Sequence, residues 1–168
     1  MHAQRAAEEL LRTGAYGSWV VADLDLVNCF CHFEWPAVRS SAAAIAPALE
    51  PWLGWCTQQA VRVRLPSGEW RWLDRGAEQG DPEGSFKSSA VLADVCERTA
   101  AAFASEAGAD SGVGAVDWWY IDDGRLVIRA RFLDRWLQIL DAELAKVGAT
   151  RVAADGTVKS SARLLGWW

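Results

Sequence analysis

The 168-residue chain lacks the features that mark membrane proteins and zinc proteins. No apolar run approaches the ~20 residues that cross a bilayer. The opening stretch, MHAQRAAEELLRTG, predicts a charged amphipathic helix rather than a signal peptide. The four cysteines show no CxxC spacing and the two histidines do not pair with them, which favours reduced, buried thiols over a zinc site. We therefore expect an intracellular protein, nuclear or cytoplasmic, with no membrane partner.

The chain also has fewer basic residues than acidic ones, 17 against 22. The net charge is −5, and no block of Lys and Arg forms the basic stripe of a stand-alone nucleic-acid-binding protein. Arg62, Arg64 and Arg71 alternate with apolar residues, a pattern typical of solvated strand faces. Charge alone argues against nucleic acid as a partner, so any such function has to come from a specific site.

Hydrophobic residues make up half of the chain, enough for the core of one domain. The patterns predict a helix near 3–13, a strand at 18–26, a helix from Pro36 to Pro47 or Pro51, and a hairpin of 60–65 with 69–74. A glycine-rich loop at 75–85, a helix at 86–105, a hairpin of 113–121 with 125–130, a helix over 132–147 and a strand pair within 150–165 follow. This order predicts an α+β fold, with helices on one face of a mostly antiparallel sheet.

Carboxylates mark two of the predicted strands. Asp23 and Asp25 alternate along the first strand and so point to the same side, while Asp122 and Asp123 fall in the turn of the second hairpin. If the two strands are neighbours, these side chains converge, and hard oxygen ligands of this kind suit Mg²⁺. The alternative is that Asp122, Asp123 and Gly124 only form a hairpin turn, for which Asp-Gly is favoured.

Four sequence blocks resemble, in order, those of the reverse transcriptase palm. They are DLVNCF (Asp25 and Phe30), RGAEQGDPEGS (Gly76, Gln79, Gly80, Asp81, Pro82 and Ser85), YIDD (Tyr120, Asp122 and Asp123), and ELAKVGAT with TVKSSARLLG (Lys159). The second block looks closest to the non-LTR retrotransposon type. The resemblance implies a ferredoxin-like or RRM-like palm core.

The resemblance implies an RNA-directed DNA polymerase, in which a primer 3′-hydroxyl attacks the α-phosphate of a dNTP with two Mg²⁺ ions, or Mn²⁺ in their place, as cofactors. Asp25 and Asp122 would hold both ions, Asp123 would contribute more weakly, and the carbonyl of Leu26 would reach the ion that carries the triphosphate.

Further roles are carried over from the family. Phe30 would exclude a 2′-hydroxyl, and Lys159 would be the acid for the departing pyrophosphate. Gly76, Gln79 and Gly80 would support the template base and the nascent pair, because glycine permits close backbone approach.

The same resemblance implies that residues 1–168 are a palm domain of a retroelement-derived polyprotein, without most of the fingers and without the thumb. The expected partners are an RNA template, a DNA primer, dNTP and the missing regions. The chain alone is expected to be weakly active or inactive. Glu83 departs from the family, which usually has an apolar residue there.

Two alternatives stay open. One is a non-catalytic palm remnant with a structural or nucleic-acid-binding role. The other is a Mg²⁺-dependent phosphatase of the haloacid-dehalogenase type, because VVADLDLV also fits that family's opening, with Asp23 as nucleophile and Asp25 as acid/base. That family needs a parallel, doubly wound sheet, against which the two predicted hairpins argue.

Overall fold

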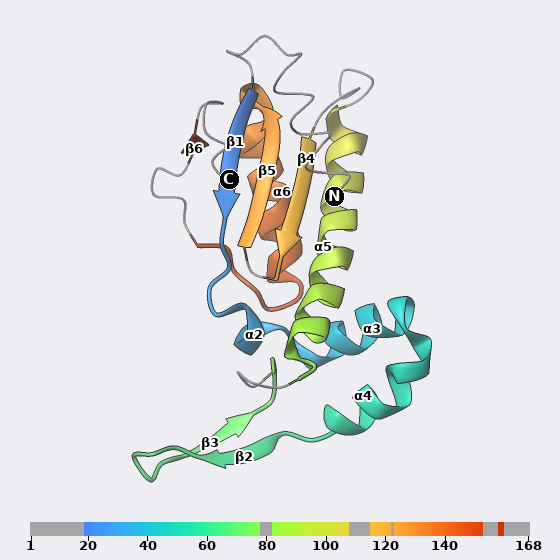
Figure 1. Ribbon diagram of the computed structural model, residues 1–168, viewed down its shortest axis with the longest axis vertical. Coiled ribbons are helices and arrows are strands. Elements are labelled where there is room, and N and C mark those ends of the chain that lie inside the picture. Colours follow the sequence, from blue (N-terminus) through green and yellow to red (C-terminus); the bar gives the residue numbers. More distant parts are fainter. Residues whose placement is uncertain (1–18, 78–81, 108–114, 122, 153–157, 160–168) are drawn as a thin grey trace, which may run out of the picture.

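The structure, a computed structural model, describes residues 19–77, 82–107, 115–121, 123–152 and 158–159 (Figure 1). It has a mixed α+β fold with one four-stranded antiparallel sheet, a separate two-stranded sheet and several helices. The predicted α+β class is confirmed. The helix expected at 3–13 lies outside the described residues.

The larger sheet consists of β1 (Trp19–Leu24), β4 (Ala115–Tyr120), β5 (Asp123–Arg129) and β6 (Val158–Lys159), in the order β4-β5-β1-β6. All its pairings are antiparallel. The sequence predicted a strand pair within 150–165. Instead, β6 pairs with β1, and Arg151 bridges Leu26 just beyond β1. The chain's last described segments therefore complete the ladder of β1, whose second edge would otherwise be unpaired.

Helices α5 (Gly84–Ala107) and α6 (Leu133–Ala145) cover one face of this sheet (Figure 1). The side chains of β1 and β5 alternate between its faces, so Leu24 and Leu126 join the main core with the two helices. The 3.6-residue spacing of apolar residues predicted the buried stripe of α6, which is Trp136, Ile139, Leu140 and Leu144. On the opposite face, Trp19, Val21 and Val127 form a second, smaller buried cluster.

A second group of elements lies beyond the end of the sheet. It comprises α2 (Cys29–His32), α3 (Trp35–Ile45), the 3-10 turn η1 (Pro47–Leu49), α4 (Glu50–Cys56), β2 (Val61–Arg64) and β3 (Trp70–Leu73). A further 3-10 turn, η3 (Ala130–Phe132), leads into α6. Pro47 occupies an early position of its turn, because proline lacks the N–H that a continuing helix would need. Among the helices of the described ranges, none combines the length and apolarity needed to cross a membrane.

Candidate carboxylate site at one end of the sheet

Two exposed carboxylates lie at the same end of the four-stranded sheet, on neighbouring strands. The antiparallel register of β1 and β5 ends with the pair Leu24–Gly124. The next residue along β1 is Asp25 and the preceding residue of β5 is Asp123, so both lie at the same end of neighbouring strands. Both residues are exposed to solvent. The expectation that these two segments belong to adjacent antiparallel strands is confirmed, whereas Asp122 lies outside the described residues.

The turn between β4 and β5 differs from the sequence prediction. Tyr120 pairs with Asp123 and Ile121 is a turn residue, while Asp123 and Gly124 already belong to β5. The interpretation of Asp123-Gly124 as turn residues was therefore wrong. Ile121 adopts a left-handed backbone with φ 61°, which costs a β-branched residue on the order of 1–3 kcal/mol.

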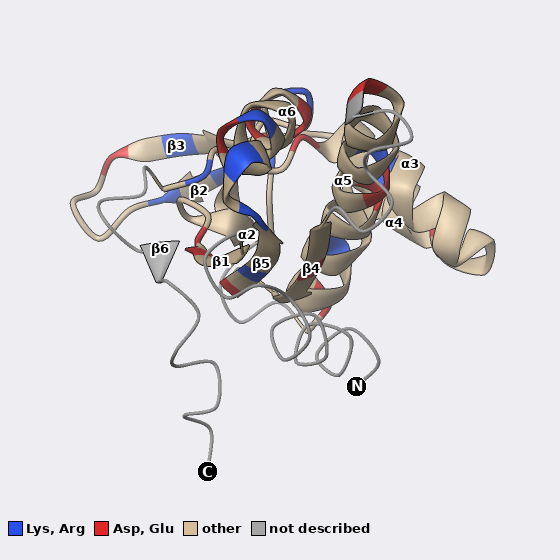
Figure 2. Cartoon of the chain, turned by 90° about the horizontal axis from the view of Figure 1, so that it is seen from above, with Lys and Arg blue, Asp and Glu red and all other residues tan. Residues whose placement is uncertain are grey.

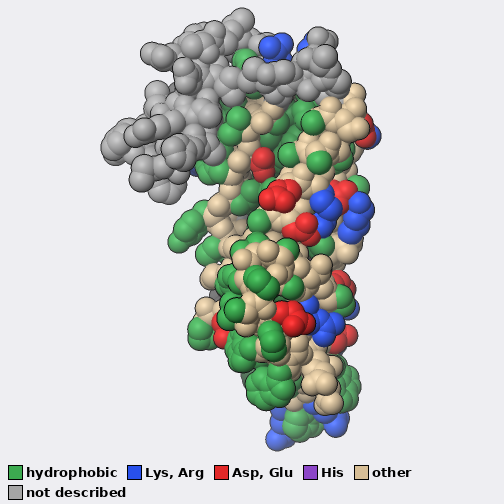
Figure 3. All heavy atoms as spheres, turned by 90° about the vertical axis from the view of Figure 1, so that its right-hand side faces the viewer, with side chains coloured by type: hydrophobic (Ala, Val, Ile, Leu, Met, Phe, Trp, Pro, Cys, Tyr) green, Lys and Arg blue, Asp and Glu red, His purple; other side chains and the backbone are tan. Residues whose placement is uncertain are grey.

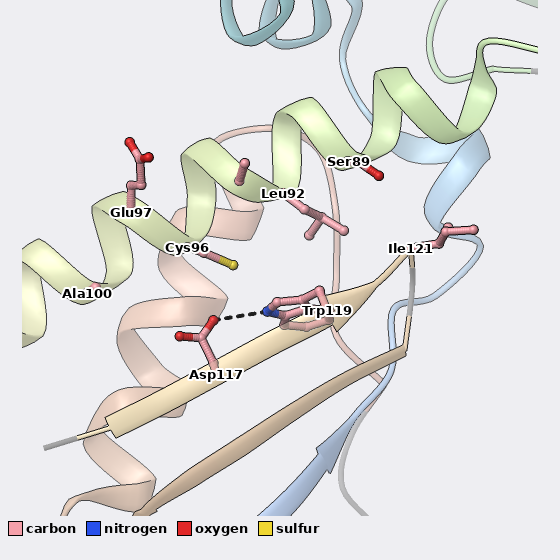
Figure 4. A pocket seen from close by; sticks show the side chains of 9 residues that line it. Ser89, Leu92, Cys96, Glu97, Ala100, Asp117, Trp119 and Ile121 are labelled. Carbon is pink, nitrogen blue, oxygen red and sulfur yellow. Dashed lines mark hydrogen bonds between the residues drawn. The ribbon is translucent and has the colours of Figure 1, made fainter. Parts of the chain in front are cut away.

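The side chain of Ile121 is half-buried. It lines a pocket of about 420 Å³ between α5 and β4, opposite Ser89 and Leu92 of α5 (Figure 4). A strained backbone conformation next to an acidic pair is typical of a functional site.

Gly124 is required by its cross-strand neighbour. A Cβ atom at this position would lie 2.6 Å from Cε3 and Cζ3 of Trp119, its partner in β4. The Trp119 ring is held in turn by its Nε1–H, which donates to Asp117 Oδ2 at 3.2 Å (Figure 4). The glycine thus allows the tryptophan to lie flat over the strand that starts with Asp123.

The same pocket contains the thiol of Cys96. Burial raises the pKa of this thiol far above its ordinary value, and the neighbouring carboxylate of Asp117 raises it further. The thiol is therefore neutral and acts as a packing group. The pocket lies between α5 and β4, and the carboxylates of Asp25 and Asp123 lie at the end of the neighbouring strands β1 and β5.

Asp23 has a different environment from Asp25. Its Oδ1 lies 3.2 Å from Nε of Arg125, the residue directly opposite in β5. The two residues share the sheet face of Val21 and Val127. Asp23 therefore has a cationic partner within the sheet, which suits a structural ion pair.

The backbone around Leu26 leaves its carbonyl directed toward the β5 side. Val27 N–H donates to Thr150 O at 2.9 Å, and Val152 N–H donates to Asp25 O at 2.8 Å. These bonds flank the bridge between Leu26 and Arg151, so the polar groups of Leu26 itself point away from that strand. The Leu26 side chain is buried in the main core, which fixes the position of its carbonyl.

The first and second sequence blocks meet at α2. Gly76 has φ 68°, and a Cβ there would lie 2.5 Å from the Phe30 carbonyl oxygen. Gly76 N–H donates to Phe33 O at 2.7 Å, and Trp35 Nε1–H donates to Gly76 O at 2.9 Å. Gly76 is thus the contact by which the second block docks on α2. Gln79 and Gly80 lie outside the described residues.

Phe30, a residue of α2, is half-buried next to the first residue of α5. A Cβ on Gly84, the first residue of that helix, would lie 3.4 Å from Cδ1 of Phe30, which is ordinary contact distance. Glu83, the residue before the helix, pairs with Lys87 Nζ at 3.5 Å. The negative charge that departs from the family is thus partly compensated within the first turn.

Lys159 lies on the other side of β1. The register pairs it with Val21, four residues before Asp25 and about 13 Å from it along the strand. Its role as an acid stays a prediction.

Among the described residues, no group of three or more His, Cys, Asp or Glu side chains is arranged to hold a metal ion. Asp122 does not belong to the described residues. The pair that is described consists of exposed carboxylates, the hard oxygen ligands that Mg²⁺ prefers.

No family model matches the chain, and no curated protein matches it. Solved structures of telomerase do. The chain aligns over 94% of its length with telomerase from Candida albicans in complex with a TWJ fragment of telomeric RNA, at a TM-score of 0.63 and 14% identity. It aligns over 92% with a C-terminally truncated apo telomerase from Candida tropicalis, at 0.60 and 11% identity. The chain covers 30% and 35% of those two chains. The similarity is therefore one of fold, to about a third of a telomerase chain.

Proposed function

We propose that the chain is the palm of a reverse-transcriptase-like nucleotidyltransferase, of the non-LTR retrotransposon type, which adds dNTP to a primer 3′-hydroxyl on an RNA template. Telomerase, the structural neighbour, is a polymerase related to the reverse transcriptases. The observation that carries the proposal is the position of Asp25 and Asp123, exposed at one end of two neighbouring antiparallel strands.

In this proposal Asp25 and Asp122 are the main metal ligands, Asp123 contributes more weakly, and the Leu26 carbonyl completes the set. When bound, two Mg²⁺ or Mn²⁺ ions neutralise charge on the attacking and leaving oxygens. The exposure of Asp25 and Asp123 supports this assignment, because ligands of a shared ion must reach both water and phosphate.

Other residues would position the substrates. Phe30, half-buried beside Gly84, would exclude a 2′-hydroxyl from the sugar pocket. Gly76 would anchor the loop from which Gln79 and Gly80 reach the template base and the nascent pair. Lys159 has the least support as the proton donor to pyrophosphate, because its register lies about 13 Å along the strand from Asp25.

The phosphatase alternative does not fit the fold. It needs a parallel sheet, whereas every described pairing is antiparallel. It also needs Asp23 as a nucleophile, and Asp23 is paired with Arg125. The non-catalytic remnant remains as an outcome of the experiment below.

The experiment is a titration with Mn²⁺, followed by electron paramagnetic resonance, of the chain and three variants. Asp25→Ala and Asp122→Asn should each weaken Mn²⁺ binding at least tenfold, because each removes a main ligand. Asp23→Asn, on the same strand but ion-paired, should bind as the unaltered chain does. Equal affinity in all four proteins would overturn the proposal and favour the remnant.

Primer extension on an RNA template gives the second readout. The chain as given is expected to extend a primer weakly or not at all, because positioning of primer, template and triphosphate supplies much of the catalysis of phosphoryl transfer. In a fusion that supplies fingers and thumb, Asp25→Ala should abolish incorporation and Asp23→Asn should largely preserve it.

A further inference from the structure

The hairpin of β2 and β3 forms a sheet of its own with an unusual face. Its register pairs Arg62 with Trp72 and Arg64 with Trp70. Paired residues point to the same side, and side chains alternate along each strand. The two arginines and two tryptophans therefore share one face, which we call the Arg-Trp face.

The side chains of the Arg-Trp face contact one another. The Arg62 guanidinium carbon lies 4.9 Å from the ring centroid of Trp70 and 5.9 Å from that of Trp72. Trp70 is nonetheless 50% exposed and Trp72 66% exposed. Cation–π contact on one side holds the indole rings in place and leaves much of their surface open to solvent.

The hairpin also differs in charge from the rest of the chain. Residues 61–75 contain four arginines against Glu69 and Asp74, a net charge of +2, although the whole chain carries −5. Arg71 pairs with Glu69 at 2.9 Å, and Arg75 pairs with Asp74 and Glu34. In contrast, no carboxylate of a described residue forms a salt bridge with Arg62 or Arg64. Figure 2 shows the basic residues on both strands.

We propose that the Arg-Trp face binds single-stranded nucleic acid. Bases would stack on the open surfaces of Trp70 and Trp72, and phosphates would pair with Arg62 and Arg64. This combination of aromatic platforms and cations without a carboxylate partner among the described residues is the one by which proteins hold single strands without reading their sequence. A duplex fits poorly, because its bases are already stacked on one another.

The location of the face fits such a partner. Figure 1 shows the hairpin extending from the end of the molecule where α2 follows β1, and Figure 3 shows basic and hydrophobic side chains together at this lower end. The bridge between Glu34 and Arg75 ties the base of the hairpin to the start of α3. A strand bound here would lie at the same end of the molecule as Asp25.

The experiment is fluorescence anisotropy with labelled 12-nucleotide single-stranded RNA, single-stranded DNA and duplex DNA, in EDTA. Because EDTA removes metal, the result is independent of the metal site and of the proposed polymerase function. The chain should bind both single strands more tightly than the duplex, and the RNA and DNA arms show which of the two it prefers.

Variants of the Arg-Trp face test whether the single strand binds there. Trp72→Ala should weaken single-strand binding about tenfold, in line with the loss of one stacked base, while Trp72→Phe should retain most of the affinity. The double variant Arg62→Ala/Arg64→Ala should reduce the slope of log affinity against log salt by about 1.4, which is ~0.7 for each lost phosphate contact.

Two exposed residues serve as matched controls. Trp55, on α4, is 74% exposed, and Arg71 lies on the other face of the hairpin, paired with Glu69. Trp55→Ala and Arg71→Ala should bind as the unaltered chain does. The proposal is overturned if the chain fails to bind single strands at low salt, if the duplex binds equally well, or if the controls lose as much affinity as Trp72→Ala. Absence of oligonucleotide binding would leave a protein partner for this face.

Discussion

Replacement of Gly124 by alanine tests how the strand that carries Asp123 is held. The added Cβ would lie 2.6 Å from two atoms of the Trp119 ring, whereas carbon atoms in good contact are about 3.5–4.0 Å apart. The ring must therefore move by about 1 Å. Such a movement disturbs the hydrogen bond to Asp117 and the packing of the ring against the main core.

The magnitude follows from three contributions. Overpacking costs about 1–3 kcal/mol, and the weakened hydrogen bond costs up to ~1 kcal/mol. Alanine returns about 0.4–1 kcal/mol by restricting the unfolded chain. We expect the free energy of unfolding to fall by about 2 kcal/mol, which for a chain of this length lowers Tm by about 4–8 °C.

Thermal unfolding followed by circular dichroism measures this shift, and the chain offers a control. Gly54 lies within α4 with nothing near the position of a Cβ, so Gly54→Ala should raise stability, by up to ~1 kcal/mol. In a Trp119→Ala background, Gly124→Ala should cost almost nothing. A Tm for Gly124→Ala equal to or above that of the unaltered chain would refute the reasoning.

Three further predictions concern other parts of the molecule. Gly76→Ala should cost more than Gly124→Ala in the same thermal assay, because its Cβ would meet the backbone of α2 at 2.5 Å and its φ is 68°; a smaller cost would show that the loop shifts freely. Hydrogen bonding from Lys146 and then from Arg98 lowers the pKa of the buried Glu143, so its stabilisation is present at neutral pH and is lost in acid, as the pH falls through the lowered pKa. Glu143→Gln should thus lower stability at pH 7 by about 1–2 kcal/mol, with a gap that narrows in acid; a gap independent of pH would contradict this. In a fusion that supplies fingers and thumb, Phe30→Ala should raise the use of rNTP relative to dNTP, and an unchanged ratio would assign Phe30 to packing alone.

The sequence predicted the elements whose signals are local. The alternating residues around Pro-Ser-Gly gave the hairpin of β2 and β3, and the 3.6-residue spacing gave α6. The long helix begins two residues earlier and ends two residues later than predicted, at Gly84 and Ala107. These features depend on neighbours in the chain, so periodicity and turn residues were sufficient to find them.

The turn beside the carboxylates could not be predicted in this way. Asp123-Gly124 is the favoured turn sequence, and Ile121 is a residue that disfavours a positive φ. In the structure Ile121 takes the positive φ instead, and Gly124 lies within β5 under the ring of Trp119. The contact between Trp119 and Gly124 depends on the cross-strand register, which the turn sequence alone does not reveal.

The Arg-Trp face was missed for a different reason. The alternation of Arg62 and Arg64 was interpreted as a solvated strand face, which it is. Only the register, which brings Trp70 and Trp72 opposite the arginines, shows that the face combines cations with aromatic rings. The available signal was Arg at every second position of one strand and Trp at every second position of the next, on either side of a tight turn.

The most direct test of the proposed metal site is anomalous X-ray diffraction from crystals of the chain soaked with Mn²⁺ and a dNTP. The account predicts anomalous peaks within about 2.0–2.5 Å of carboxylate oxygens of Asp25 and Asp122. Manganese bound only elsewhere, or Asp25 and Asp122 too far apart to share an ion, would contradict it.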